Sequence, residues 1–389
     1  MLFAKLNDLS IGGKGSYGIA ASAVERKADL PTYLRITDIF DDGTLNPNEL
    51  KSVDAPNSDK YILKPNDIVF ARTGGSTGRN YFYDGSDGVF VYAGFLIKFS
   101  IDPEKVNPKY VKYYCRSKQY NDWVQSFNTG STRGNINAQT FGNMEIPLPD
   151  RKQQDYLVSI LEPIDEKIKI NKQINDNLQQ QAFSVFDNLI ANAENNDCTV
   201  SDYAFLNPKR TLAKNQVARS IDMSQLSTSG AFPSGWEMKP FNGGMRFTNG
   251  DTLLARITPC LENGKTAFID FLDDGEIGFG STEYIVLAPK NDTPPEMLYC
   301  LARYPAFVDY AVKNMNGSSG RQRVSAETVG QYRLPLFDKH SLVLFKEVVS
   351  PMFLKMRYNS LENMRLAVLR DALLPKLMSG EIDVSAVQL

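Results

Sequence analysis

The sequence predicts a mixed α/β (α+β) protein in which two α/β domains alternate with two long helices that pack on each other. Three observations predict this fold class. Residues 150–190 carry a coiled-coil seam, residues 338–378 carry a second copy of it, and the regions before the two seams share short segments in the same order. The chain therefore has the pattern of an internal repeat.

The first long helix is predicted by a narrow apolar stripe whose members recur in steps of three and four. They are Leu157, Leu161, Ile164, Ile168, Leu178, Ala182, Val185 and Leu189. A helix of about 40 residues is about 60 Å long. A stripe this narrow on a helix this long needs a partner helix to cover it.

The partner helix is predicted in the same chain. Adding 188 to the residue numbers maps much of the stripe onto apolar residues at Met352, Met356, Leu366, Leu373 and Leu377. The same offset places Pro163 on Pro351. Ala182 is the exception because it maps onto Arg370, whose aliphatic stem we expect to cover the seam.

Asparagines occupy the positions that the seam skips. The offset of 188 relates Asn171 to Asn359 and Asn175 to Asn363. Buried polar residues in a coiled coil are best known as devices that fix helix register. We predict this role for the four asparagines; the alternative is that the helices splay here and the amides are hydrated.

Residues 1–149 are predicted to form the first α/β domain. Short β-rich runs at Tyr33–Ile36, Asp67–Ala71 and Phe90–Phe99 are separated by clusters of Gly, Pro and Asn. A helical pattern follows from Pro108. Short strands together with helices are typical of a small mixed α/β domain.

Residues 193–337 repeat this layout. Asp67–Arg72 corresponds to Asp251–Arg256 at an offset of 184, and Ile146–Leu148 corresponds to Leu334–Leu336 at an offset of 188. We therefore expect a second domain related to the first.

The expected boundaries follow from these patterns. They are a first domain at 1–149, a first long helix at 150–192, a second domain at 193–337, and a second long helix with a C-terminal tail at 338–389.

Composition narrows the functional classes. The net charge is −2, so any contact with DNA has to come from local basic patches. The chain has one histidine and four scattered cysteines without a CxxC spacing, which indicates neither a zinc site nor a disulfide framework. We therefore expect no metal site. We also expect a cytoplasmic location, since no apolar run is long enough to span a bilayer.

Polar loops with arginines are the candidate DNA-contacting segments. In the first region the candidate residues are Arg72, Thr73, Ser76, Thr77, Arg79, Arg133 and Asn135. In the second region they are Arg256, Lys265, Arg321, Gln322 and Arg323. Arg pairs with guanine, Asn and Gln pair with adenine, and hydroxyl groups hold phosphates. The alternative for each residue is an ordinary solvent-exposed loop.

A metal-dependent nuclease is a second functional hypothesis. Asp150, Asp165 and Lys167 fit the loose spacing of a site in which two acids and a lysine hold a metal and activate water. The helical pattern around Asp165 favours a solvated helix face instead, so we expect no catalytic residue. Asn263–Thr266 lacks the leading glycine of a phosphate loop, because position 259 is Pro.

The chain resembles the specificity subunit of type I restriction-modification systems. The resemblance is carried by Ile146–Pro149 with Ile164–Ile168, by Leu334–Leu336, and above all by Leu373–Ile382 (LLPKLMSGEI). It covers essentially the whole chain. It implies that the α/β domains are target recognition domains, each of which reads one half of a bipartite double-stranded DNA target.

The resemblance also implies the role of the helices and the partners. The helices would form an antiparallel coiled coil that relates the two halves by a pseudo-twofold, spaces the domains and docks two methyltransferase subunits, with restriction subunits joining through the complex. Adenine methylation and DNA cleavage would belong to those partners, and S-adenosylmethionine, ATP and Mg would bind only there. A coiled-coil scaffold that binds no DNA is the remaining alternative.

Overall fold

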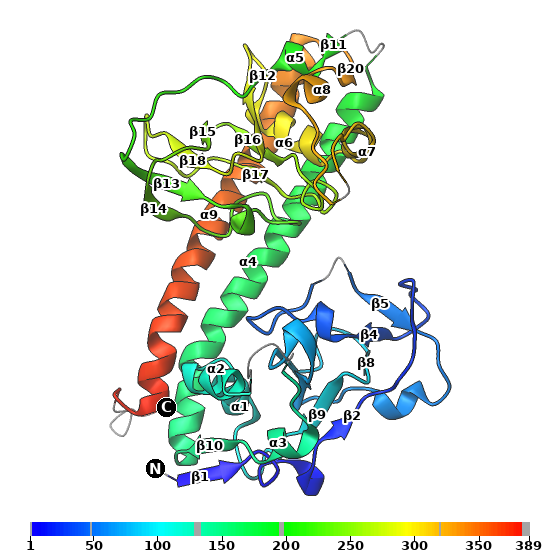
Figure 1. Cartoon of the computed structure of the whole chain (residues 1–389), viewed down its shortest axis with the longest axis vertical. Coiled ribbons are helices and arrows are strands. Elements are labelled where there is room, and N and C mark those ends of the chain that lie inside the picture. The colour runs from blue at the N-terminus through cyan, green and yellow to red at the C-terminus, as the bar shows by residue number, and fades with distance from the viewer. Residues whose placement is uncertain (1, 47–48, 128–133, 194–197, 319, 383–389) are drawn as a thin grey trace. The chain divides into compact units, whose positions relative to one another are not determined.

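The structure is a computed structural model that describes residues 2–46, 49–127, 134–193, 198–318 and 320–382. The chain forms two compact units (Figure 1). Unit 1 comprises Met1–Asp165 and Val368–Leu389, and unit 2 comprises Glu166–Ala367. Each unit contains one α/β domain and a segment of both long helices, α4 (Arg151–Ala191) and α9 (Lys339–Ser379).

Unit 1 contains two four-stranded sheets and one strand pair. The first sheet has the antiparallel order β2 (Ser16–Tyr17), β9 (Leu96–Ser100), β6 (Asp67–Ala71) and β7 (Asn80–Tyr83). The second has the order β3 (Ala23–Val24), β5 (Lys51–Val53), β4 (Thr32–Leu34) and β8 (Phe90–Tyr92), in which β4 and β8 are parallel. β1 (Leu2–Lys5) pairs with β10 (Glu145–Leu148), which leads into α4.

Short helices complete the unit 1 domain. They are α1 (Pro108–Tyr114), α2 (Lys118–Gln125) and α3 (Ala138–Gly142). Asn107, Ser117 and Asn137 cap them, because each side chain accepts a hydrogen bond from a backbone N–H of the first turn. The β-rich run Phe90–Phe99 is divided between the two sheets, since a turn at Ala93–Phe95 carries the chain from one sheet to the other.

Unit 2 repeats this topology. Its first sheet has the order β12 (Ala204–Leu206), β19 (Tyr284–Pro289), β16 (Thr252–Ala255) and β17 (Thr266–Phe268). Its second has the order β14 (Glu237–Pro240), β13 (Val217–Ile221), β18 (Gly278–Gly280) and β15 (Met245–Phe247), with β13 and β18 parallel. The strand pair is β11 (Cys198–Thr199) with β20 (Arg333–Leu334), and the short helices are α5 (Val200–Tyr203), α6 (Pro295–Arg303), α7 (Pro305–Lys313) and α8 (Ala326–Gly330).

The predicted internal repeat is confirmed by this comparison. β2-β9-β6-β7 and β12-β19-β16-β17 have the same strand order, and each unit has a parallel pair in its second sheet. The units differ at the margin of that sheet, where unit 1 adds β3 beyond β5 and unit 2 adds β15 beyond β18. None of the described helices combines the length and apolar composition that crossing a bilayer requires.

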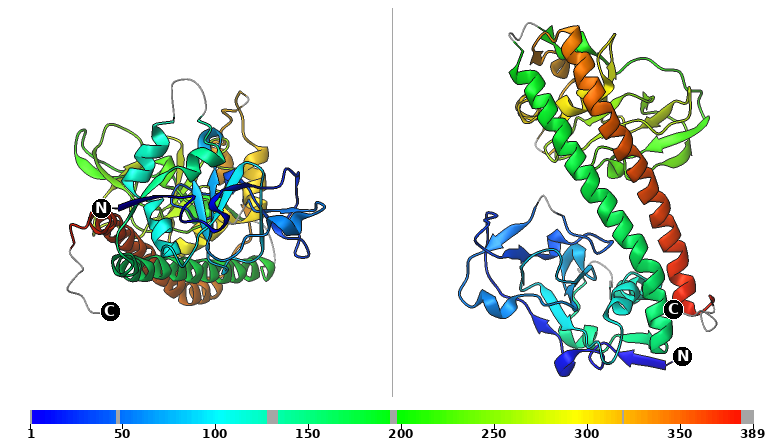
Figure 2. Two further views of the ribbon diagram at one scale, coloured as in Figure 1. Left: turned by 90° about the horizontal axis from the view of Figure 1, so that it is seen from below. Right: turned by 180° about the vertical axis from the view of Figure 1, so that it is seen from behind.

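The two long helices pair antiparallel within each unit (Figures 1 and 2). In unit 1 the early α4 residues Leu157 and Leu161 share a buried core with the late α9 residues Leu374 and Met378. In unit 2 late α4 residues share a core with early α9 residues, and these are Ala182, Phe186, Phe345 and Val349. The predicted antiparallel intramolecular coiled coil is therefore confirmed.

The seam asparagines form hydrogen bonds from one helix to the other within unit 2. Asn171 Nδ2 donates to Asn363 Oδ1 at 2.9 Å, and Asn359 Nδ2 donates to Asn175 Oδ1 at 2.8 Å. Asn171 and Asn359 are each only 1% exposed, so these amides are buried rather than hydrated. Because the offset of 188 exchanges one pair for the other, the contacts repeat with twofold character. Their control of register stays a prediction.

Asp165 is the centre of a partly buried ion cluster in unit 1, with its side chain only 13% exposed, so the expectation of a solvated helix face at this residue is wrong. Its Oδ2 accepts hydrogen bonds from Arg116 Nη1 at 2.8 Å and from the Tyr113 hydroxyl at 3.0 Å, and it lies 3.4 Å from Lys112 Nζ. Its Oδ1 accepts from Arg370 Nη1 at 3.1 Å. Arg370 thus contributes a charge to the helix interface in addition to its stem.

The surrounding cations decide the charge state of Asp165. Burial raises the pKa of this carboxyl, but the attraction of Arg116, Lys112 and Arg370 outweighs burial and holds the pKa below its ordinary value. The folded-state pKa therefore lies below that of the unfolded chain. The resulting stabilisation is present above the unfolded-state pKa and is lost as the pH falls through the folded-state pKa.

We predict that Asp165→Asn lowers the free energy of unfolding by about 3 kcal/mol at neutral pH, because it leaves buried cations without their carboxylate. Denaturant unfolding of the full chain measures this loss. The difference between variant and wild type should shrink in acid. Glu166→Gln is the control, since the neighbouring Glu166 is exposed; equal losses in the two variants would contradict a role for the cluster.

Candidate nucleic-acid interface

In each unit the loop that follows a central strand, β6 or β16, meets the loop that precedes a short helix, α3 or α8. We call this region the junction. In unit 1 the chain leaves β6 at Arg72, whose carbonyl accepts a hydrogen bond from the Ile136 N–H at 2.9 Å. In unit 2 it leaves β16 at Arg256, whose carbonyl accepts from the Val324 N–H at 3.0 Å. Both unit 1 and unit 2 therefore place an arginine beside the loop that precedes a short helix, α3 or α8.

The unit 1 junction brings several predicted contact residues together. Thr73 and Asn135 form an isolated antiparallel bridge. Thr77 Oγ1 donates to the Gly134 carbonyl at 2.9 Å, which ties the loop after β6 to the loop before α3. Asn135 is exposed. The predicted contact Arg133 lies outside the described residues.

The Arg72 guanidinium lies against two aromatic rings. Its central carbon is 5.2 Å from the centre of the Tyr17 ring and 5.8 Å from the centre of the Phe95 ring. Both distances fall within the range of cation–π attraction. Arg72 Nε is buried and has no hydrogen-bond partner among the described residues, and the side chain donates to none of them. The terminal N–H donors of Arg72 are therefore not used by any described residue.

The other end of the unit 1 loop is tied down more firmly. Arg79 Nε donates to Asp41 Oδ1 at 2.7 Å and Arg79 Nη1 donates to the Ile39 carbonyl at 3.2 Å, while Ser76 is buried. The Asp41 side chain is highly exposed, and ion pairs of this kind contribute little to stability. A phosphate can therefore replace Asp41 at modest cost, whereas Ser76 is covered.

Arg256 and Arg323 of the unit 2 junction converge on one carboxylate. Arg323 Nε and Nη2 donate to Glu283 at 2.9 and 2.7 Å, and Arg256 Nε donates to Glu283 Oε2 at 3.2 Å. The Arg323 hydrogen bonds are the main reason why the pKa of Glu283 is lowered, so the carboxylate stays charged at neutral pH. These two arginines share one negative charge.

The remaining unit 2 candidates have different surroundings. Arg321 is exposed, and the backbone N–H of Gln322 donates to Thr258 Oγ1 at 3.1 Å. Lys265 Nζ donates to the Met223 carbonyl at 2.8 Å. The junction therefore presents Arg321 and holds Gln322 by its backbone, while the Lys265 amine is engaged by the protein itself.

Three residues that the sequence reasoning did not single out shape these junctions. Phe95 and Glu283 occupy equivalent positions, because their carbonyls accept the N–H of Arg72 and of Arg256 at 3.1 and 3.0 Å. The offset of 188 that relates the helices also relates residue 95 to residue 283, so this signal was available in the sequence. Tyr17 carries no such signal, since it reaches Arg72 through strand pairing alone.

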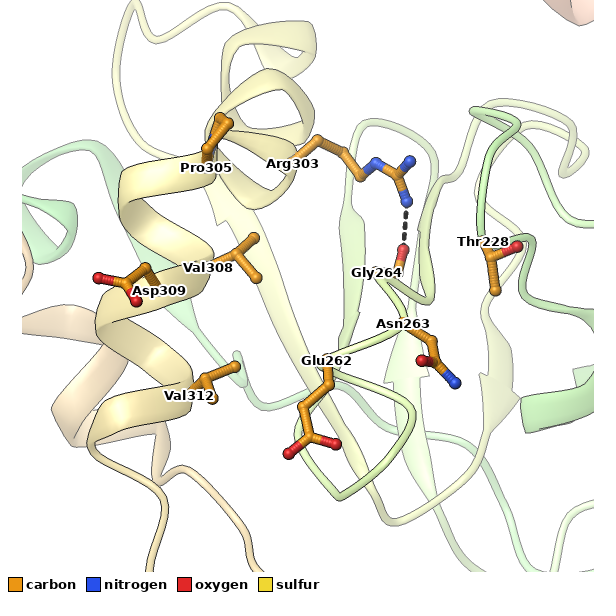
Figure 3. Close-up of a pocket in the computed structure, with 9 residues that line it drawn as sticks. All are labelled: Thr228, Glu262, Asn263, Gly264, Arg303, Pro305, Val308, Asp309 and Val312. Atoms are coloured by element: carbon orange, nitrogen blue, oxygen red, sulfur yellow. Dashed lines mark hydrogen bonds between the residues drawn. The ribbon is translucent and has the colours of Figure 1, made fainter. Parts of the chain in front are cut away.

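A surface pocket in unit 2 lies beside the junction loops, between α7 and the turn that contains Glu262, Asn263 and Gly264 (Figure 3). Arg303 also lines the pocket, but its Nη1 already donates to the Gly264 carbonyl. The carboxylates of Glu262 and Asp309 leave the pocket without a cationic excess. It is therefore unsuited to a phosphate group, in line with the rejection of a phosphate loop at 263–266.

The residues of the nuclease hypothesis all have structural partners. Asp150 Oδ1 accepts the Gln153 N–H at 2.8 Å at the start of α4. Asp165 is enclosed by the cations of unit 1, and Lys167 Nζ pairs with Glu362 Oε2 at 3.4 Å. Asp165 neutralises neighbouring cations and Asp150 caps a helix. Neither role involves catalysis, so the nuclease alternative has no support.

Comparison with known proteins agrees with this architecture. Residues 27–180 match the family model described as "Type I restriction modification DNA specificity domain". The type I restriction enzyme HindI specificity subunit of Haemophilus influenzae is 23% identical over 94% of this chain and 98% of its own length. The EcoAI specificity subunit of Escherichia coli is 35% identical, over 32% of this chain and 22% of its own.

A solved structure has the same fold. The type I restriction-modification S subunit from M. genitalium superposes with a TM-score of 0.53 at 17% identity, covering 97% of this chain and 95% of that one. The duplicated domains, the antiparallel helix pair and the sequence matches lead to one conclusion. Residues 27–180 carry a type I restriction modification DNA specificity domain, and the chain as a whole is similar to type I restriction-modification specificity subunits.

Proposed function

We propose that this chain is the sequence-specific DNA-binding subunit of a type I restriction-modification complex, in which each α/β domain reads one half of a bipartite double-stranded target. The observation that carries the proposal is the junction, which occurs in both units with an arginine at the end of the central strand. Two similar reading modules in one chain fit a target made of two half-sites.

The junction residues supply both kinds of contact that sequence-specific binding needs. Arginine, asparagine and glutamine side chains match the base edges of the major groove, whereas threonine hydroxyls and backbone N–H groups suit phosphates. With a net charge of −2, the chain gains affinity for DNA from these local groups and from its partners rather than from its overall field.

The chain is non-catalytic in this proposal, and its helices dock the subunits that catalyse. Apolar side chains remain exposed on the long helices, and exposed apolar surface of this kind is typical of protein interfaces. They are Ile170 on α4 and Val343, Leu344, Val348, Leu354, Tyr358, Val368 and Leu369 on α9. Two methyltransferase subunits would bind there, with restriction subunits joining through the complex, and S-adenosylmethionine, ATP and Mg would bind in those partners.

A cytoplasmic location belongs to the same proposal. Cys115, Cys198, Cys260 and Cys300 are all free thiols, as expected for a reducing compartment. The DNA target places the complex in the same compartment.

We predict that the two junctions act on different half-sites. The chain assembled with its methyltransferase partner should select a bipartite sequence from a randomised duplex library. Replacing Arg72 and Arg79 with Ala should weaken selection about ten- to hundredfold in one half only, and replacing Arg321 and Gln322 with Ala should do so in the other half only. Equal losses in both halves would contradict the assignment, and absence of any DNA selection would favour a scaffold.

We also predict that the helices set the accepted spacer between half-sites. Residues 169–175 of α4 lie opposite 359–365 of α9, as the asparagine pairs show. Duplicating both heptads keeps the seam in phase and lengthens the pair by about 10 Å. This is about three base pairs of DNA, at about 3.4 Å per step. Duplicating the heptad in α4 alone is the control, and an unchanged spacer after the paired duplication would disprove the ruler role.

A further inference from the structure

We propose that Arg72 is a specificity-determining residue of unit 1 and that it reads a guanine through its terminal nitrogens. This inference rests on the proposed function and names the chemistry of one position within the first half-site. It is carried by the arrangement of Tyr17, Phe95 and Glu283, which differs between the two junctions although the backbone does not.

The aromatic pair fixes the direction of the Arg72 side chain. Tyr17 lies on β2, where it pairs with Ile97, and its hydroxyl accepts the Ala138 N–H at 3.1 Å. Phe95 is anchored next to Arg72 by the backbone hydrogen bond between them. The rings are thus held by the sheet and by α3, and they hold the guanidinium before DNA arrives. Pre-organisation of this kind reduces the entropy lost on binding.

We call the aromatic pair of Tyr17 and Phe95 the clamp. It leaves the terminal-nitrogen edge of the Arg72 guanidinium available. The Nε edge is buried, while the terminal nitrogens donate to no described residue. Two coplanar donors match the O6 and N7 acceptors of guanine in the major groove. Tyr17 and Phe95 are 44% and 55% exposed, and among the described residues their rings are what the Arg72 guanidinium contacts. Such a rim fits base edges better than it fits a hydrated phosphate.

Unit 2 shows what the same arginine does without the clamp. Glu283 stands where unit 1 has Phe95, and it binds Arg256 through the side chain as well as through the backbone. A carboxylate at this position competes with a base for the guanidinium donors. Residue 95 or 283 therefore decides whether the arginine at the strand end is free to read DNA.

The test uses the full chain assembled with its methyltransferase partner and a randomised duplex library at constant salt. Arg72→Ala should relax one guanine position of one half-site and lower the discrimination there about ten- to hundredfold. Arg72→Lys should also lose discrimination because it keeps the charge without the fork. Phe95→Glu should relax the same position although Arg72 is still present, whereas Phe95→Tyr should retain it.

The controls separate this inference from folding and from the proposed function. Lys105→Ala removes an exposed cation of unit 1 paired with Asp102 and should change nothing. Thermal unfolding of each variant checks that it folds. If Arg72→Ala is unstable, Phe95→Tyr still tests the proposal, because loss of the guanine preference in this variant would contradict the role of the clamp.

Other outcomes overturn the proposal in distinguishable ways. A loss of affinity that is equal for all sequences, with a salt dependence reduced by about one charge, would make Arg72 a phosphate contact. An unchanged guanine preference in Arg72→Ala would refute the inference and leave the proposed function intact. A wild-type complex that selects no bipartite sequence would refute the proposed function itself.

Discussion

The pairing of α4 with α9 is the constraint on which the rest of the molecule depends. Both helices carry buried amides, and a buried amide without a partner costs about 1–3 kcal/mol. In the observed alignment Asn171 meets Asn363 and Asn175 meets Asn359. Sliding one helix by a turn would set these amides against apolar seam residues. The alignment that satisfies the amides is also the one that buries Leu157 and Leu161 in unit 1 and Ala182 and Phe186 in unit 2.

The two copies satisfy one helix interface with different chemistry. Unit 1 places Asp165 beside Arg370, Lys112 of α1 and Arg116, which follows α1. The equivalent positions in unit 2, at the offset of 188, are Phe353 and Ala182, which lie in an apolar core. Arg370 interrupts the apolar seam because its counter-ion, Asp165, is present only in this copy.

The two junctions likewise share a backbone frame and differ in their side chains. The backbone hydrogen bonds at Arg72 and Arg256 are alike, so the frame that positions the arginine is kept. The side chain that meets the guanidinium is Phe95 in one unit and Glu283 in the other. A fold that holds its frame by backbone contacts can vary its loop side chains freely, so equivalent junctions can present different chemical groups.

The sequence by itself determined the long helices, their partnership, the seam positions of the asparagines and the duplication, because 3.5-residue periodicity and a fixed offset are local or repeated signals. It also selected the junction loops. Only the tertiary structure decided that Phe90–Phe99 is shared by two sheets, that Asp165 lies among cations, and that Glu283 binds Arg256 while Arg72 forms no side-chain hydrogen bond to a described residue. These outcomes depend on which strands and helices meet, and side chains distant in sequence become partners only through that packing.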